Sequence, residues 1–210
     1  MITPNINLSP APRKKGRPLS FDRDAALHKA MLLFWAHGYE ATSLNDLTAA
    51  LGVKPSSIYT VFGDKKRLFF EAVARYTSGP VTAESLIAQA ATARDAAQTL
   101  MSAAAIGFTG DETPKGCLLA TSAISCSAGA QDVQKALAEI RLSIEARLTA
   151  KALADIQAGR LPADSDGQAL AAHVLAVIQG LSTLARDGAS TAKLLRVVDV
   201  AMRAWPESTP

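Results

Sequence analysis

The chain has 210 residues, of which 49% are hydrophobic and only 5% aromatic, so it can bury a globular core, and its abundant alanine favours close-packed helices over a β-sandwich. The net charge of +3 is uneven: residues 1–78 hold 11 Lys and Arg against 6 Asp and Glu, whereas residues 79–210 hold 11 against 13. The basic first third predicts contact with an acidic polymer or an anionic surface.

The few cysteines and histidines limit the disulfide and metal chemistry that the chain can support. Cys117 and Cys126 are too few for a disulfide framework, and no zinc-binding spacing joins them to each other or to a histidine. The histidines, His28, His37 and His173, are widely scattered, so we expect no metal and no cofactor. The N-terminus lacks the apolar core of a signal peptide, and a reducing cytoplasm fits this cysteine content.

Residues 1–20 contain four prolines and no apolar periodicity, which predicts a disordered arm. Within it, "RKKGRP" places Arg13, Lys14, Lys15 and Arg17 around a Gly-Arg-Pro core. This segment resembles AT-hook segments, in which an extended arginine enters a narrow minor groove of A·T-rich DNA. The alternative is a tail that only improves solubility.

The first two predicted helices have clear end signals. Asp22 is a predicted N-cap, apolar residues follow at helical spacing, and Gly38 is a natural stop. Ser43 with Asp46 three residues later predicts a capping-box start for a second, short helix that ends at Gly52.

A third helix is predicted from Pro55, which suits a first helical position, to Phe62. Gly63 breaks the chain, and Asp64 caps a fourth helix that runs to "SGP" at residues 78–80. We therefore expect one domain over residues 21–78 and a larger one over residues 79–210.

The second and third helices, joined by a tight turn, have the dimensions of a helix-turn-helix motif, whose second helix enters the major groove of DNA. On a helical wheel of this third helix, Ile58, Val61 and Phe62 face inward. The outer face carries hydroxyl groups, with Ser56 and Thr60 at its centre and Ser57 and Tyr59 at its margins. These groups can bond to base edges and phosphates.

Lys65, Lys66 and Arg67 lie in the first turn of the fourth helix, where the helix dipole disfavours cations. A phosphate would compensate, because helix-start N–H groups and an ammonium together form an anion site. The alternative is a solvated run of charge.

The stretch "GYEATSLNDLTAALGVKPSSIYTVFGDKKRLFFEAV" resembles the DNA-binding domain of the tetracycline-repressor (TetR) family, over about positions 21–77. The agreement is in residue type and spacing at Gly38, Thr42, Leu47, Ala50, Gly52, Val53, Tyr59, Phe62, Lys65 and Leu68. Lys54 departs from it, because many members have a small capping residue there. Two expectations follow: either the start of the third helix is looser than in those members, or Lys54 itself contacts DNA.

The resemblance implies which residues bind DNA. Thr42 would contact a phosphate near the start of the second helix, the segment from Lys54 to Thr60 would read the major groove, and Tyr59 and Lys65 would hold the backbone. Besides the four basic residues of the arm, the predicted DNA-binding set is Thr42, Ser43, Lys54, Pro55, Ser56, Ser57, Tyr59, Thr60 and Lys65.

The remaining sequence predicts helices over about 82–108, 115–128, 131–158, 165–186 and 190–204, with no competing strand pattern. The protein is thus predicted to be all-α. The uncharged run between Asp166 and Arg186 approaches the length of a membrane span. Its polar side chains would lack partners in lipid, so we interpret it as a helix buried between protein surfaces and expect no membrane.

A weaker resemblance to the family's C-terminal domains, in "KGCLLATSA" and "VIQGLSTLARDGAS", implies a homodimer formed by the last two helices. Their apolar residues cover more than one face, which calls for a second partner. The predicted interface residues are Leu170, Val174, Val177, Leu181, Leu184, Leu194, Val198, Ala201 and Trp205. A dimer would set two recognition helices roughly 34–36 Å apart on a palindromic operator.

The family resemblance also implies an effector pocket among the middle helices, for which the candidate residues are Met101, Phe108, Cys117 and Ile124. The alternative is that these are core residues. Cys117 with His173 lacks the third group of a catalytic triad, so no enzyme is expected.

The predicted function is a DNA-binding transcriptional regulator, a homodimeric repressor that a small-molecule effector releases from double-stranded operator DNA. Two alternatives stay open: a regulator without an effector, and a thiol-based redox or metal sensor that uses Cys117.

Overall fold

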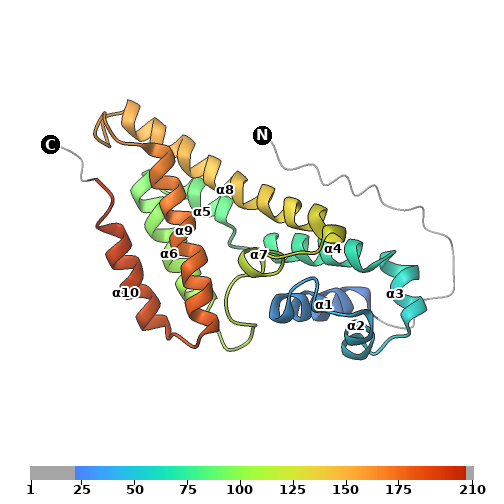
Figure 1. The fold of residues 1–210 in the computed structure, drawn as a ribbon. Helices are drawn as coiled ribbons and strands as arrows, with labels where there is room; N and C mark the ends of the chain where they lie inside the picture. The colour runs from blue at the N-terminus through green and yellow to red at the C-terminus, as the bar shows by residue number, and fades with distance from the viewer. Residues whose placement is uncertain (1–21, 207–210) are drawn as a thin grey trace.

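The computed structural model describes residues 22–206, which form ten α-helices and one short 3₁₀ helix without any β-strand in that range. The all-α prediction is confirmed. Four N-terminal helices form a unit that we call the head: α1 (Arg23–His37), α2 (Leu44–Leu51), α3 (Pro55–Phe62) and α4 (Lys65–Thr77). In Figure 1 the head lies on one side of the molecule and most helices of the rest of the chain lie on the other, but the long helix over Gln131–Gln157 extends across to α4.

The helices of the head begin where the local signals predict. The Asp22 carboxylate accepts hydrogen bonds from the first N–H groups of α1, and Ser43 and Asp46 form the complete capping box of α2. Pro55 occupies the first position of α3, and the Asp64 carboxylate accepts from the Arg67 N–H of α4 at 2.7 Å. Gly52 ends α2 in the left-handed conformation.

An aromatic cluster holds α1 against α4. The Phe69 ring lies edge-on to Phe34 and to Tyr39, with ring centroids 5.0 Å apart in both pairs. Ile58 and Phe62 carry α3 onto the same core and are at most 2% exposed. Because each such burial stabilises the fold by about 1.5–3 kcal/mol, α3 can be short and still keep one orientation.

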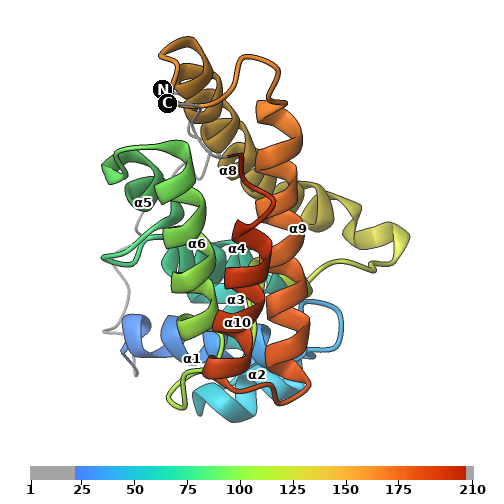
Figure 2. The same ribbon diagram turned by 90° about the vertical axis from the view of Figure 1, so that its left-hand side faces the viewer.

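The rest of the chain forms a helical bundle. Its elements are α5 (Ala83–Gln89), α6 (Ala93–Gly107), α7 (Leu118–Thr121), η1 (Ala128–Ala130), α8 (Gln131–Gln157), α9 (Gly167–Arg186) and α10 (Thr191–Met202). Figure 2 shows α6, α9 and α10 side by side, and α8 packs across α9. The α9–α10 loop is short, as predicted, and α10 returns antiparallel along α9.

Two predicted helices of the C-terminal part are wrong in extent. The segment 82–108 contains two helices, because Thr92 caps a new helix and the buried Asp155 carboxylate accepts from the Ala93 N–H at 2.6 Å. The segment 115–128 contains the single turn of α7 and the first residue of η1. Consequently Cys117, at the N-cap of α7, and Cys126, in the following loop, do not share a helix.

One helix in the described part of the chain, α9, is long and apolar enough to span a membrane. About a third of that stretch, 33%, is buried within this subunit. A packed helix of a helical bundle passes the same test of length and composition as a membrane span, so the stretch by itself gives weak evidence for a membrane.

Candidate nucleic-acid interface

The outward face of α3 carries hydroxyl groups in the predicted orientation. Ser56 and Thr60 are exposed, Tyr59 is 51% exposed, and Ser57 is half-buried. The Thr60 hydroxyl donates to the Ser56 carbonyl at 2.8 Å, which leaves the lone pairs of the Thr60 oxygen directed away from that bond. A short helix fixed from below by Ile58 and Phe62 therefore presents polar groups to the surroundings.

Lys54 begins α3 without using its side chain. It occupies the N-cap position with an extended backbone, and its side chain makes no capping hydrogen bond. Lys54 and Pro55 are both exposed next to the hydroxyl-bearing face. The geometry thus agrees with both interpretations of Lys54. The start of α3 lacks a side-chain cap, as a looser helix start requires, and the Lys54 ammonium is not used in capping, as a DNA contact requires.

Ser43 is exposed at the start of α2, but its hydroxyl is occupied. It accepts from the Asp46 N–H at 3.1 Å and lies 2.6 Å from the Asp46 carboxylate, to which it donates. The hydrogen bonds that the Ser43 hydroxyl and N–H donate to the Asp46 carboxylate lower the pKa of Asp46. The role that the structure shows for Ser43 is to cap α2.

Thr42 is placed differently from the expectation. Its side chain is 1% exposed, and its hydroxyl donates to the Gly38 carbonyl at 2.7 Å. A buried hydroxyl that closes the α1–α2 turn does not lie on the surface that would meet a phosphate. We therefore correct the predicted role of Thr42 from a phosphate contact to a structural bond in the turn.

The basic residues at the start of α4 have different partners. The Lys65 ammonium lies 4.5 Å from the centre of the Tyr39 ring and donates to the Glu40 carbonyl at 3.4 Å. Partial burial lowers the pKa of Lys65, and the Glu40 and Asp46 carboxylates oppose that shift. Lys66 instead pairs with Asp132 of α8 at 2.7 Å, which raises the pKa of Lys66. Lys65 is therefore the better candidate for a phosphate contact.

The predicted contacts of the N-terminal arm, Arg13, Lys14, Lys15 and Arg17, lie outside the described residues. Their role stays a prediction.

Most residues predicted for the dimer interface are covered within the subunit. Val174, Leu181, Leu194, Val198, Ala201 and Trp205 are at most 8% exposed, and Leu170, Val177 and Leu184 are half-buried. We correct the first six to core residues, because α6 and α8 already cover that side of α9 and α10.

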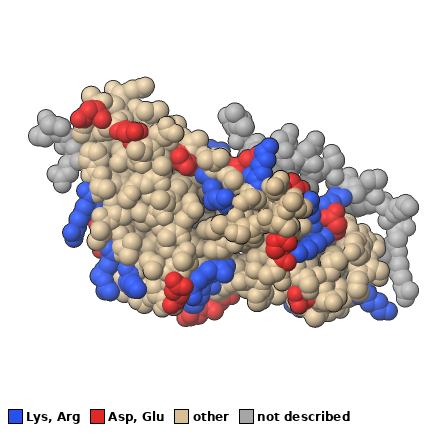
Figure 3. All heavy atoms as spheres, viewed as in Figure 1, with Lys and Arg blue, Asp and Glu red and all other residues tan. Residues whose placement is uncertain are grey.

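A different face of the bundle is open and apolar. On α9, Ala172, Ala176 and Gly180 are exposed, and on α8, Leu142 and Leu153 are 60% and 48% exposed. Figure 3, which shares the view of Figure 1, shows a broad area without charged side chains over α9, whereas charged side chains lie along α8.

The candidate effector residues do not form one lining. Met101 is fully buried and Phe108 and Cys117 are 8% exposed, whereas Ile124 is 58% exposed on the surface. Ile124 therefore does not line an interior pocket with the other three, and we correct that expectation.

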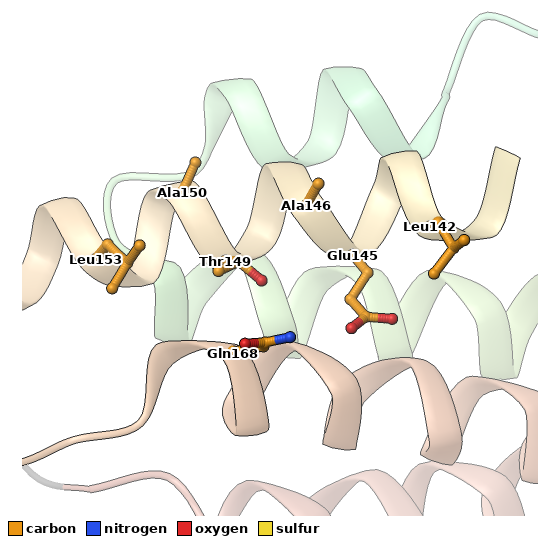
Figure 4. A pocket seen from close by; sticks show the side chains of 7 residues that line it. All are labelled: Leu142, Glu145, Ala146, Thr149, Ala150, Leu153 and Gln168. Atoms are coloured by element: carbon orange, nitrogen blue, oxygen red, sulfur yellow. The ribbon is translucent and has the colours of Figure 1, made fainter. Parts of the chain in front are cut away.

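Two hollows occur elsewhere in the described structure. One, of about 390 Å³, lies between α8 and α9, where Glu145 and Thr149 of α8 lie opposite Gln168 of α9 (Figure 4). The other, of about 450 Å³, is lined by Arg94, Asp199, Met202, Arg203 and Trp205. Neither is lined by a candidate effector residue.

Cys117 is buried at the junction of the head and the bundle. The Tyr76 hydroxyl donates to its sulfur at 3.5 Å, and burial raises the pKa of Tyr76. The Cys117 N–H donates to Ser182, which lies about 13.5 Å along α9 from His173 at the helical rise, so the geometry does not pair Cys117 with His173. Among residues 22–206, no three His, Cys, Asp or Glu side chains are grouped to hold a metal ion.

The residues that join the head to the bundle were not predicted from the sequence. The Trp35 indole donates to the Gly116 carbonyl at 3.0 Å, and the Arg186 guanidinium donates to carbonyls of α1. The only local signal was the isolated Gly116 before an apolar run. Nothing in the sequence pairs Trp35 with Arg186, because they are far apart along the chain.

A short helix that follows a tight glycine turn and presents hydroxyl groups beside lysines defines a helix-turn-helix DNA-binding protein. Residues 26–72 match the family model for bacterial regulatory proteins of the tetR family, and residues 86–201 match the tetracyclin repressor-like C-terminal domain. The chain belongs to the TetR family, and it is a DNA-binding transcriptional regulator.

Similar proteins agree with this assignment over most of the chain. The HTH-type transcriptional repressor ComR of Escherichia coli (strain K12) is 37% identical over 198 residues, which cover 93% of this chain and 94% of ComR. A cysteine-substituted variant of the TetR family regulator CifR, solved with 26-base-pair operator DNA, superposes with a TM-score of 0.85 at 38% identity. That match covers 91% of this chain and all of the CifR chain, 100%.

Proposed function

We propose that this regulator is a homodimeric repressor that binds a palindromic operator and is released by a small-molecule effector. The observation that carries the proposal is the exposed hydroxyl face of α3, fixed by a buried core beneath it. The naming of the full-length relative ComR as a repressor supports the sign of regulation, and the CifR complex supports double-stranded operator DNA as partner.

In this proposal α3 enters the major groove. Ser56 and Thr60 contact base edges, and Tyr59 and Lys65 hold phosphates on either side. Lys54 and Pro55 stand at the helix start, nearest to the groove floor, and the basic arm follows the minor groove of the neighbouring segment.

The proposed dimer uses the open face of the bundle rather than the covered residues of α10. Small residues on α9, Ala172, Ala176 and Gly180, permit close approach of a symmetry-related α9, and the exposed leucines of α8 extend the apolar area. A two-fold axis through this face would place two copies of α3 on one side of a duplex.

The effector is proposed from family membership, and its chemistry is left to experiment. We also propose that the protein acts in the cytoplasm and carries no catalytic activity.

The alternative is a regulator that responds to no small molecule. A compound that binds saturably and weakens operator binding would distinguish the two. Cys117 is buried, and residues 22–206 hold no metal-binding group of side chains beside it, which argues against the thiol-sensor alternative.

The proposal is tested by selecting fragments of the organism's genomic DNA that the protein retains. We expect enrichment of a palindromic motif by the parent protein. Replacing Ser56 and Thr60 by Ala should change the enriched motif, whereas Thr99→Ala, at an exposed position of α6, should leave it unchanged. An unaltered motif with the Ser56→Ala and Thr60→Ala variants would contradict the assignment of α3 as the reading helix.

A further inference from the structure

The last turn of α9 bonds directly to the end of α1. The two terminal nitrogens of Arg186 donate to the Trp35 carbonyl at 2.5 Å and to the Ala36 carbonyl at 3.2 Å. Carbonyls in the last turn of a helix have no partner within the helix and carry the negative end of its dipole. Arg186 therefore supplies both the missing donors and the complementary charge for α1, from a residue of the other part of the molecule.

Gly116 closes this junction. Its carbonyl accepts from the Trp35 indole at 3.0 Å, and the next N–H, of Cys117, donates to the Ser182 hydroxyl at 2.8 Å. Gly116 has a φ of 81°, and a Cβ there would lie 2.9 Å from the Ser182 carbonyl and 3.0 Å from Arg186 Nε. These contacts hold the chain at Gly116 between α1 and α9. In Figure 1 the loop between α6 and α7 passes between the same two helices.

Other contacts between the head and the bundle go to α7, η1 and α8. The Ser122 carbonyl accepts from the Tyr39 N–H at 2.9 Å, Glu40 bonds to Ser127, and Lys66 pairs with Asp132. The Lys66 and Asp132 side chains are 37% and 57% exposed. Exposed ion pairs contribute little, because water and salt screen them, so the link to α8 is a weak constraint on the head.

We propose that Arg186, seated against Gly116, couples the position of α9 to the orientation of the head. This inference rests on the proposed dimer, in which the exposed small residues of α9 meet the second subunit. One helix then carries both the dimer contact and the cap of α1, so it sets the separation of the two copies of α3. Arg186 is a positioning residue, and a ligand that shifts α9 along its axis would change the half-site spacing that the dimer accepts.

The coupling is tested with duplexes that carry the selected palindrome, its half-site separation shortened or lengthened by one or two base pairs, and with a duplex that carries one half-site. The parent is expected to prefer one separation. Arg186→Gln should lower that preference by roughly tenfold, the effect of losing a charge-assisted hydrogen bond, while single half-site affinity stays within about twofold. Arg186→Lys, which keeps the charge without the fork, should fall between the two.

Asp132→Asn is the matched control, since it removes the exposed link between the head and α8 and should leave the spacing preference unchanged. An unchanged spacing profile in both Arg186 variants would overturn the coupling, and so would a loss of half-site affinity as large as the loss for the palindrome. If Arg186→Gln does not fold, the Arg186→Lys profile decides alone. Failure of the proposed function appears separately, as a parent protein that prefers no palindrome over random duplex.

Discussion

The salt dependence of DNA binding tests the proposed phosphate contact of Lys65. Its ammonium is held at the first turn of α4 by the Tyr39 ring and the Glu40 carbonyl, without a carboxylate partner within the described structure. We expect Lys65→Ala to weaken binding to operator and random duplexes alike. The slope of log K against log salt should flatten by about 0.9 for each phosphate that is no longer neutralised, or about 1.8 for a dimer.

Lys66→Ala is the matched control, because Asp132 already neutralises that neighbouring ammonium at 2.7 Å. Its salt slope should stay close to the parent's. Equal slopes for the parent and Lys65→Ala in a fluorescence anisotropy titration would contradict the phosphate role of Lys65.

Thr42 leads to the opposite prediction. Because its hydroxyl is buried in a bond to the Gly38 carbonyl, Thr42→Val should lower the free energy of unfolding by about 1 kcal/mol and leave the salt slope unchanged. Urea unfolding and the same anisotropy titration measure the two effects. A flattened salt slope in a variant of parental stability would restore the phosphate contact that the sequence predicted.

Among the elements, α6 depends on a contact from a distant helix. The Asp155 carboxylate of α8 is 2% exposed, accepts from the Ala93 N–H and pairs with Arg160. Asp155→Ala would leave the buried N–H at the start of α6 without an acceptor, and we expect a loss of about 2–3 kcal/mol in urea unfolding. Asp164→Ala, in an exposed loop, should stay within about 0.5 kcal/mol. Equal midpoints for the two variants would contradict this role of Asp155.

The bond between the Asp155 carboxylate and the Ala93 N–H also shows why some helix starts could be predicted from the sequence and others could not. In the head each helix start is encoded by its own residues, such as Ser43 with Asp46 or Asp64 with the Arg67 N–H, so the predicted starts are confirmed. The break before α6 lies in an alanine-rich run that favours a continuous helix, and the Asp155 contact comes from far along the chain. The residues after Gly116 likewise bond to Trp35, Tyr39 and Ser182 instead of continuing a helix.

For the molecule as a whole, apolar periodicity showed that α9 and α10 are buried but not what covers them. Leu194 and Val198 have the spacing of an interface stripe, yet neighbouring helices of the same subunit cover both. The polar face of α3 was predictable because hydroxyl groups at helical spacing have few uses inside a protein. An apolar face has several possible partners, so a single sequence does not choose among them.

The proposed dimer gives a prediction at this scale. Ala176 is exposed on α9, whose residues 167–185 include no charged side chain. Ala176→Arg should therefore leave the subunit folded and place like charges together across a two-fold axis. We expect a monomer in sedimentation analysis and an operator affinity reduced to that of a single half-site.

Ala91→Arg, in the exposed loop between α5 and α6, adds the same charge away from this face and should remain a dimer. A dimeric Ala176→Arg variant would exclude this face as the interface.

The cap that Arg186 places on α1 recognises main-chain carbonyls, which any side chain at those positions would leave in place. The head could therefore be exchanged between relatives, provided that the Trp35 indole, or an equivalent donor for the Gly116 carbonyl, is kept. Under the proposed function, such chimeras would combine the operator of one protein with the effector response of another, so this junction is a suitable place to join domains when new genetic sensors are built.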